Sequence, residues 1–195
     1  MICMKKKTWR IYLGKIPYKE KGNFWVSFES DPGLKTTKAN IYGRCLPCIQ
    51  NLYTQLKEER NEIALGTAYN CWKVTAILNS IEECLSLLNE FEKRVPTGHV
   101  YGKLGSSRKD SKTKVVVFHT ESESERDRVR EALEICLPAV TDSAGEVTIS
   151  RACAVLYDDI LGNWRHWHPQ TPIKHPENVV SVLERIKKTL YMSEM

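Results

Sequence analysis

Three of the five histidines in this chain lie in one short stretch, RHWHPQTPIKHPEN, at residues 165–178. His166 and His168 are two residues apart, so their imidazole rings point the same way if the backbone is extended there. His175 follows after two prolines and can return to the same place. Imidazole nitrogens are common ligands of Zn and other transition metals. The stretch therefore predicts a metal site, a loop that binds nucleic acid, or a stiff surface loop before the last helix.

A second set of candidate ligands stands at the ends of two predicted buried strands. His119 ends the strand TKVVVFH, and Asp158 and Asp159 follow the strand EVTISRACAVLY. If these strands are parallel, both ends meet at one edge of the sheet, where open α/β sheets bind their ligands. Two carboxylates that hold a water suit metal-assisted phosphodiester hydrolysis, with His119 or His168 as a further ligand or proton carrier. We therefore expect a divalent metal, Mg or Mn, at this edge.

The histidine-rich stretch also interleaves aromatic rings with cations, a pattern that binds single-stranded nucleic acid. Each base stacked on a ring contributes roughly 1–3 kcal/mol, and cations neutralise the phosphates. The residues expected in this role are Trp164, Arg165, His166, Trp167, His168 and Lys174. The alternative is that one or both tryptophans only cap the core under a loop stiffened by proline.

The segment 102–114, GKLGSSRKDSKTK, combines glycine and serine with five cations. Its backbone amides and the side chains of Lys103, Arg108 and Lys109 suit the phosphate backbone of a nucleic acid. The segment lacks the spacing of a P-loop, however, and does not lead from a strand into a helix. The alternative is a solvated hairpin tip.

Positive charge is concentrated in two segments. Residues 1–44 contain ten Lys or Arg and three acidic residues, whereas residues 98–120 contain five and one. The net charge of the chain is only +5 because the predicted helices outside these segments are acidic. If the two segments adjoin in the fold, they form a basic face that favours a polyanionic partner. Solvated lysines scattered over loops are the alternative.

Length and composition predict a single globular domain spanning residues 1–195, since 42% of the residues are apolar and 27% are charged. No apolar run reaches the roughly 18 residues of a membrane-spanning helix. The start MICMKKKTWR lacks the apolar segment of a signal peptide. We therefore expect a cytoplasmic protein without a membrane partner.

The seven cysteines, without an export signal, indicate reduced thiols rather than disulfides. Cys45 and Cys48 form the motif CLPC at the predicted start of a helix, where the pKa of a thiol falls and redox motifs occur. The strand order of a thioredoxin-like fold and a second CxxC are both missing. Cys84, Cys136 and Cys153 lie within apolar patterns and are expected in the core.

Periodicity predicts an α/β fold that begins with three short antiparallel strands in a meander, at 8–14, 23–30 and 38–43. The remaining predicted elements are helices at 49–60 and 67–91, strands at 98–104 and 113–119, a helix at 120–137 opened by Thr120 and Glu123, a strand at 146–157 and a helix from Pro176. A meander followed by alternating helices and strands makes a mixed sheet with helices on its faces.

This order of elements resembles the ribonuclease H-like superfamily, whose members include nucleases that cut with two metal ions held by carboxylates. Some archaeal exonuclease-type proteins look similar in size and layout. The resemblance covers nearly the whole chain and implies carboxylate ligands at Glu58, Glu59 or Glu62, at Glu121 and at Glu177. The superfamily places an aspartate in the first strand, whereas WRIYLGKIP has none. If nothing replaces it, the domain binds nucleic acid without cutting it.

The leading hypothesis is therefore a nucleic-acid-binding protein that hydrolyses single-stranded DNA or RNA with a divalent metal. The predicted catalytic residues are Glu121, Asp158, Asp159, Glu177 and His119, and the predicted metal ligands are the same four carboxylates with His168. One alternative is a non-catalytic module that binds nucleic acid or a protein. A thiol redox protein that uses Cys45 and Cys48 is the third hypothesis.

Overall fold

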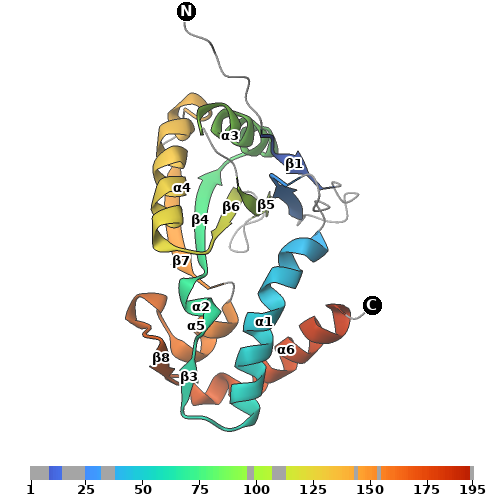
Figure 1. The fold of residues 1–195 in the computed structure, drawn as a ribbon, viewed down its shortest axis with the longest axis vertical. Helices are drawn as coiled ribbons and strands as arrows, with labels where there is room; N and C mark the ends of the chain where they lie inside the picture. The colour runs from blue at the N-terminus through green and yellow to red at the C-terminus, as the bar shows by residue number, and fades with distance from the viewer. Residues whose placement is uncertain are drawn as a thin grey trace, which may run out of the picture.

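The computed structural model describes residues 9–14, 25–31, 38–95, 99–106, 113–142, 145–152 and 155–193. These residues form a six-stranded sheet covered by two helices, and below it a second, mainly helical part (Figure 1). Each part has its own cluster of buried apolar side chains. The α/β class predicted from the sequence is confirmed, whereas the predicted mixed sheet is wrong, because every described pairing of the large sheet is antiparallel.

The large sheet is antiparallel at every described pairing. Its strands are β1 (Tyr12–Leu13), β2 (Trp25–Glu29), β4 (Trp72–Leu78), β5 (Tyr101–Ser106), β6 (Lys114–Thr120) and β7 (Glu146–Arg151). Their order across the sheet is β1-β2-β5-β6-β4-β7. Strand β6 therefore lies between β4 and β5, and β4 lies between β6 and β7.

Helices α3 (Ile81–Arg94) and α4 (Glu123–Cys136) connect these strands and pack together on one face of the sheet (Figure 1). The turn η1 (Leu137–Ala139) ends α4. The succession β4-α3-β5-β6-α4-β7, with strand order β5-β6-β4-β7, forms two interlocked split β-α-β units, the arrangement of ferredoxin-like folds. Ser80 and Ser122 cap the two helices, because each hydroxyl accepts from a backbone amide in the first turn.

Alternation of side chains makes one face of the sheet apolar. In β4, every second residue from Trp72 to Leu78 is buried on the side of α3 and α4, and the residues between them are half-buried on the opposite face. Phe118 of β6 contacts Phe28 and Phe91, with ring centroids 4.9 and 4.7 Å apart. The helices thus lie on the aromatic and aliphatic face, and the opposite face mixes polar side chains such as Lys73 and His119 with apolar ones such as Val117.

The second part consists of α1 (Lys38–Lys57), β3 (Glu62–Ala64), α2 (Thr67–Asn70), α5 (Val155–Leu161), η2 (Trp164–His166), β8 (Gln170–Pro172), η3 (Pro176–Asn178) and α6 (Val179–Ser193). Strands β3 and β8 pair antiparallel. Leu52, Ile63, Tyr157, Trp167 and Ile186 are buried in its core. None of the helices in the described ranges has the length and apolar character needed to cross a bilayer.

The most strongly periodic predictions are confirmed, since β2, β5, β6, α4 and α6 lie where the sequence predicts them. The third strand of the meander is wrong, because residues 38–43 form the start of α1. This helix runs through Pro47, and its buried stripe of Cys45, Ile49 and Leu52 packs on the second core. Packing of that stripe outweighs the strand preference of the β-branched and aromatic residues at 41–42.

The long helix predicted at 67–91 is also wrong, because the chain there forms α2, β4 and α3. Trp72, Ile77 and Leu78 fit a helical stripe, but burial follows a period of two in β4. A polar break at Asn79 and Ser80 separates the strand from α3, and the Ser80 hydroxyl caps that helix.

The strand predicted at 146–157 is half correct. Strand β7 ends at Arg151, Ala152 has a positive φ of 57°, and residues from Val155 form α5. Asp158 and Asp159 therefore lie on a helix rather than at the end of a strand. The predicted cap of α4 is shifted as well, because Ser122 rather than Thr120 accepts from the first turn, two residues later.

Candidate functional site

The ends of three neighbouring strands meet at the edge of the sheet that faces the second part of the chain. Because β6 and β7 both run antiparallel to β4, their last residues lie beside the first residues of β4. Trp72 pairs with Thr120 and Arg151, and Lys73 pairs with His119 and Ser150. Alternation sends the Trp72 row toward α4 and the Lys73 row to the opposite face.

Two of the predicted catalytic residues are linked on the Lys73 face. The ring of His119, only 4% exposed, stacks on Tyr101 with centroids 5.9 Å apart and an angle of 6° between the planes. The Tyr101 hydroxyl donates to the Glu121 carboxylate at 3.1 Å. One buried tyrosine therefore contacts both His119 and Glu121.

Asp158 joins this edge from α5. Burial by the surrounding protein raises the pKa of Asp158 to about 6, Lys73 opposes the shift and Asp159 adds to it. The side chain keeps contact with solvent. A carboxyl group that titrates near neutral pH beside a lysine is suited to proton transfer, and such shifts occur often at functional sites.

The other two predicted carboxylates are engaged elsewhere. Asp159 forms an ion pair with Arg185 at 2.5 Å, and Glu177 lies 3.2 Å from the His175 ring. In the described ranges, no group of three or more His, Cys, Asp or Glu side chains is close enough to hold a metal ion. The structure thus gathers His119, Glu121 and Asp158 at one edge, and it does not bring Asp159, Glu177 and His168 into a common metal centre with them.

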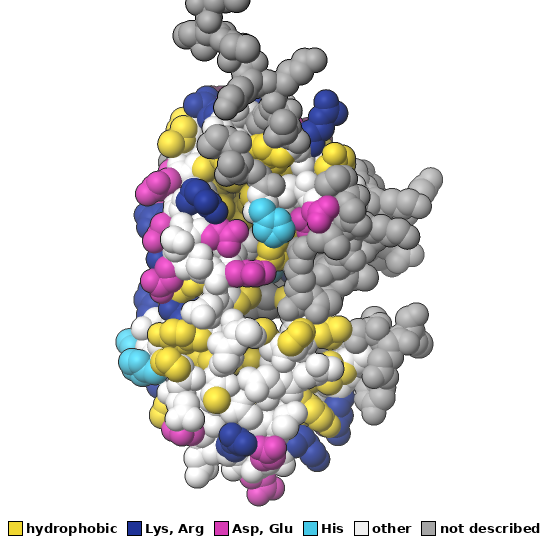
Figure 2. Space-filling model, in the orientation of Figure 1, with side chains coloured by type: hydrophobic (Ala, Val, Ile, Leu, Met, Phe, Trp, Pro, Cys, Tyr) yellow, Lys and Arg dark blue, Asp and Glu magenta, His cyan; other side chains and the backbone are white. Residues whose placement is uncertain are grey.

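The histidine-rich stretch folds as a rigid surface feature. After η2, the His168 amide donates to the Thr171 hydroxyl at 3.0 Å, and this hydroxyl donates back to the His168 carbonyl at 2.7 Å. Strand β8 then pairs with β3. His166 and His168 are exposed, and histidine side chains project at the margin of the molecule beside β8 (Figure 2).

The two tryptophans of this stretch have different roles. Trp167 is 4% exposed, its indole nitrogen donates to the Gly162 carbonyl at 3.0 Å, and its ring contacts Tyr157. The predicted stacking role of Trp167 is therefore wrong, because the core covers its ring. Trp164 is half-buried, meets Trp72 edge-to-face at 5.5 Å, and carries the Arg165 guanidinium 4.8 Å above its ring.

Exposed basic and imidazole side chains lie near Trp164 along the chain. Arg165, His166, His168 and Lys174 are all exposed, and the stem of Lys174 lies against Gly162, two residues before Trp164. We call these five residues, Trp164, Arg165, His166, His168 and Lys174, the Trp164 surface. Within the described part of the chain, no carboxylate pairs with Arg165.

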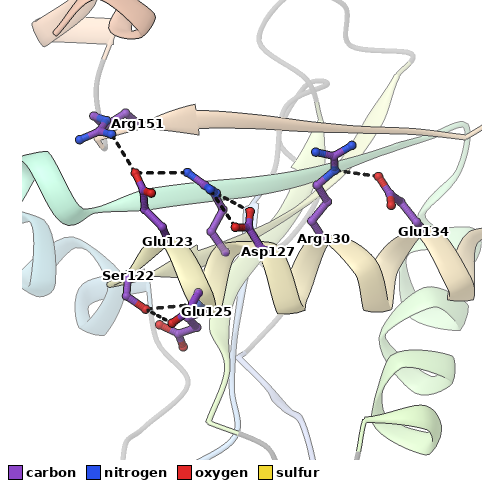
Figure 3. Close-up of polar contacts among 9 residues, drawn as sticks. Ser122, Glu123, Glu125, Asp127, Arg130, Glu134 and Arg151 are labelled. Atoms are coloured by element: carbon purple, nitrogen blue, oxygen red, sulfur yellow. Dashed lines mark hydrogen bonds and ion pairs between the residues drawn. The ribbon is translucent and has the colours of Figure 1, made fainter.

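A cluster that sequence reasoning missed adjoins the Trp164 surface. The guanidiniums of Arg126 and Arg151 lie over the Trp72 ring at 4.2 and 4.0 Å, and Arg151 also lies 3.8 Å from the Tyr69 ring. One Glu123 oxygen is 3.3 Å from Arg151 and 3.6 Å from Arg126 (Figure 3). We call Tyr69, Trp72, Glu123, Arg126 and Arg151 the arginine-tryptophan cluster.

Asp127 completes the charges of this cluster by binding Arg126 through two hydrogen bonds, at 2.8 and 3.0 Å. This pairing raises the pKa of Arg126 and lowers the pKa of Asp127. Arg151 also donates to the Tyr69 carbonyl. The only sequence signal for the cluster was the charge-dense start of α4, because its members come together through strand pairing.

The remaining basic candidates are only partly described. Lys103 is half-buried, with its ammonium 4.6 Å above the Trp25 ring. Arg108 and Lys109 lie outside the described residues. The predicted basic face, which depends on residues 1–44 and 98–120, stays a prediction for the same reason.

The cysteine predictions have mixed outcomes. Cys45 and Cys48 lie well inside α1, which begins at Lys38, so the predicted position at the start of a helix is wrong. The Cys48 sulfur contacts the Thr67 hydroxyl at 3.3 Å. Cys84 and Cys136 are buried in the core as predicted, and burial raises the pKa of both thiols, to about 12 for Cys84. Cys153 lies outside the described residues.

No family model matches this chain, and no curated protein or solved structure matches it. The resemblance to the ribonuclease H-like superfamily therefore stays a prediction, and the observed order of elements differs from the one on which it rested, because residues 38–43 are helical and a strand interrupts the helix predicted at 67–91. Glu58, Glu59 and Glu62 are exposed near the end of α1, where Glu58 pairs with Arg60 at 2.7 Å. The side chains at the strand ends and on the Trp164 surface therefore carry the functional information in this structure.

Proposed function

We propose that this chain is a non-catalytic module that binds single-stranded nucleic acid through the Trp164 surface. The observation that carries the proposal is the placement of Trp164, a half-exposed ring braced by Trp72 and covered by a guanidinium without a carboxylate partner in the described chain. A ring held beside cations offers a stacking face for a base and charge for its phosphates.

The rigidity of the surface supports this role. Trp167 anchors the stretch in the core and β8 ties it to β3, so the exposed side chains start from an ordered backbone. Binding then costs little backbone entropy, which favours affinity from a small contact area. Stacking and phosphate contacts read no base edge, so we expect weak sequence preference.

The test is fluorescence anisotropy with labelled oligo-dT and oligo-U at several salt concentrations. Trp164→Ala should weaken binding about tenfold, within the range for the loss of one stacked base. Arg165→Ala should weaken binding and lower the slope of log affinity against log salt by about one. Arg128→Ala removes an exposed arginine of α4 and serves as the matched charge control.

Equal effects of Arg165→Ala and Arg128→Ala would contradict the assigned surface, because the binding would then follow net charge alone. Affinity that does not fall as salt rises would contradict phosphate contacts. Unchanged binding of the Trp164→Ala protein would remove the stacking role.

The second candidate function is hydrolysis of the bound strand, and the raised pKa of Asp158 beside Lys73 favours it. Labelled single strands are incubated with the protein, with Mg²⁺ or Mn²⁺ and with a chelator. Shortening that the chelator and Asp158→Asn both abolish would support a metal-dependent nuclease. Strands that bind to the protein and stay intact under every condition would support the non-catalytic module.

A further inference from the structure

The arginine-tryptophan cluster and the neighbouring Thr120 contain more hydrogen-bond donors than nearby acceptors satisfy. Trp72 Nε1, Thr120 Oγ1 and Arg151 Nε are buried and, within the described chain, have no hydrogen-bond partner. Trp72 pairs with Thr120 on one side and with Arg151 on the other, so the three groups lie in one row across β6, β4 and β7. Buried polar groups are nearly always bonded, so three in a row indicate that an acceptor is missing.

The start of α4 adds positive potential at the same place. This 14-residue helix begins three residues after Thr120, and Arg126 lies in its first turn. Arg126 and Arg151 are 13% and 8% exposed at their side chains, so both cations are largely desolvated. Two guanidiniums, a row of donors and a helix N-terminus together suit an anion with several oxygens.

Glu123 is the anion that bridges both arginines in this structure, but it does so incompletely. A single carboxylate oxygen lies 3.3 and 3.6 Å from the two guanidiniums. The Glu123 side chain is 63% exposed, whereas the side chains of Arg126 and Arg151 are 13% and 8% exposed. An exposed carboxylate contributes little to such a pair and can rotate into solvent.

We propose that Glu123 occupies the place of a phosphate, and that a phosphate group of the bound strand displaces it and bridges Arg126 and Arg151. The inference rests on the proposed function, because Trp72 of the cluster is in contact with Trp164 at 5.5 Å. A base stacked on the Trp164 surface brings the phosphates of the same strand to the cluster. Free phosphate offers the same oxygens, and the experiment separates the two sources.

The test compares Glu123→Gln with Glu125→Gln. Glu125 is in the same turn of α4, but its carboxylate accepts from the Glu121 amide and pairs with no arginine in the described chain. Both variants remove one negative charge from the same helix end, but only the first removes the carboxylate that bridges Arg126 and Arg151, while Asp127 stays bound to Arg126 in both. We expect Glu123→Gln to bind inorganic phosphate and oligo-dT about fivefold more tightly than the unchanged protein, and Glu125→Gln to change both by less than twofold.

Inorganic phosphate, titrated calorimetrically against chloride at equal ionic strength, tests the cluster alone, and oligo-dT tests it within the proposed function. Tighter phosphate binding without oligonucleotide binding by any variant would support the cluster and contradict the proposed function. Equal gains for Glu123→Gln and Glu125→Gln would overturn the proposal, because net charge would explain both.

A further variant covers the case in which Glu123→Gln fails to fold. Arg151→Lys keeps the charge but loses the fork of N–H donors, so phosphate binding should weaken about tenfold while the circular dichroism spectrum is unchanged. Unchanged phosphate affinity of the folded Arg151→Lys protein would overturn the proposal.

Discussion

Replacing Trp167 by Phe should destabilise the protein without directly removing the binding surface. The substitution deletes the indole N–H that donates to the Gly162 carbonyl at 3.0 Å, which corresponds to about 1 kcal/mol. The smaller phenyl ring leaves a void in the core, because the Trp167 side chain that it replaces is only 4% exposed. Since complete truncation of a buried Trp costs about 3–5 kcal/mol, the partial loss should cost about 1–2 kcal/mol more.

The expected total is a loss of about 2–3 kcal/mol in the free energy of unfolding, or about 5–10 °C in Tm for a chain of this size. Urea unfolding followed by circular dichroism measures it. Trp164→Phe is the matched control, because Trp164 is half-buried and its ring packs edge-to-face on Trp72 without a hydrogen bond from its own nitrogen in the described chain. We expect this control to lose less than about 1 kcal/mol.

Equal losses for the two variants would refute the assignment of Trp167 to the core and of Trp164 to the surface. Oligonucleotide binding gives an independent check. Folded Trp167→Phe protein should bind oligo-dT with the same affinity as the unchanged protein. A loss of affinity as large as that of Trp164→Ala would show that Trp167, and not Trp164, stacks on a base.

Three further predictions follow from the sheet and its edge. Gly102→Ala should lower the free energy of unfolding by more than about 3 kcal/mol, because a Cβ there would lie 2.1 Å from the Val117 carbonyl oxygen and 2.4 Å from the Phe28 ring. Near-normal stability of this variant in urea would contradict the register of β5 and β6. The pKa of Asp158 is raised to about 6 from an unfolded value of about 4, so the folded state binds more protons between these values and stability falls as pH rises from 4 to 6. Asp158→Asn should abolish this fall and raise the free energy of unfolding at pH 8 by about 1 kcal/mol. This gain is smaller than the pKa shift implies, because solvent screens the side chain. Identical pH profiles of the two proteins in urea unfolding would contradict the prediction. Native thiol titration with a disulfide reagent should leave Cys84 unreacted, because burial raises its pKa to about 12, and reaction before unfolding would show that it is accessible.

Sequence periodicity predicted the elements whose local pattern agrees with their packing. Strand β6 is an unbroken apolar run, and α4 and α6 each show one apolar face, so these predictions were confirmed. The wrong predictions occurred where the apolar residues fit both the period of a helix and the period of a strand, as in the run from Trp72 to Leu78. There, burial between two helices and two neighbouring strands decides the structure, and this information is not local.

The candidate site was predictable to a similar extent. His119 and Asp158 were expected at one sheet edge, and they do lie there, although β4 separates β6 from β7 and Asp158 reaches the edge from a helix. The pairing of Arg126 with Arg151 depends on the register that places Arg151 beside Trp72. No spacing along the chain encodes that register.

The chain passes between its two parts three times, after β2, before β4 and after β7. Each part is therefore assembled from separated stretches, and no contiguous fragment contains a complete core. During synthesis, α1, β3 and α2 emerge before most of the sheet, but their apolar side chains wait for α5 and α6, which follow β7. Vectorial folding would thus complete the sheet first and leave the helical core open until the C-terminal helices leave the ribosome.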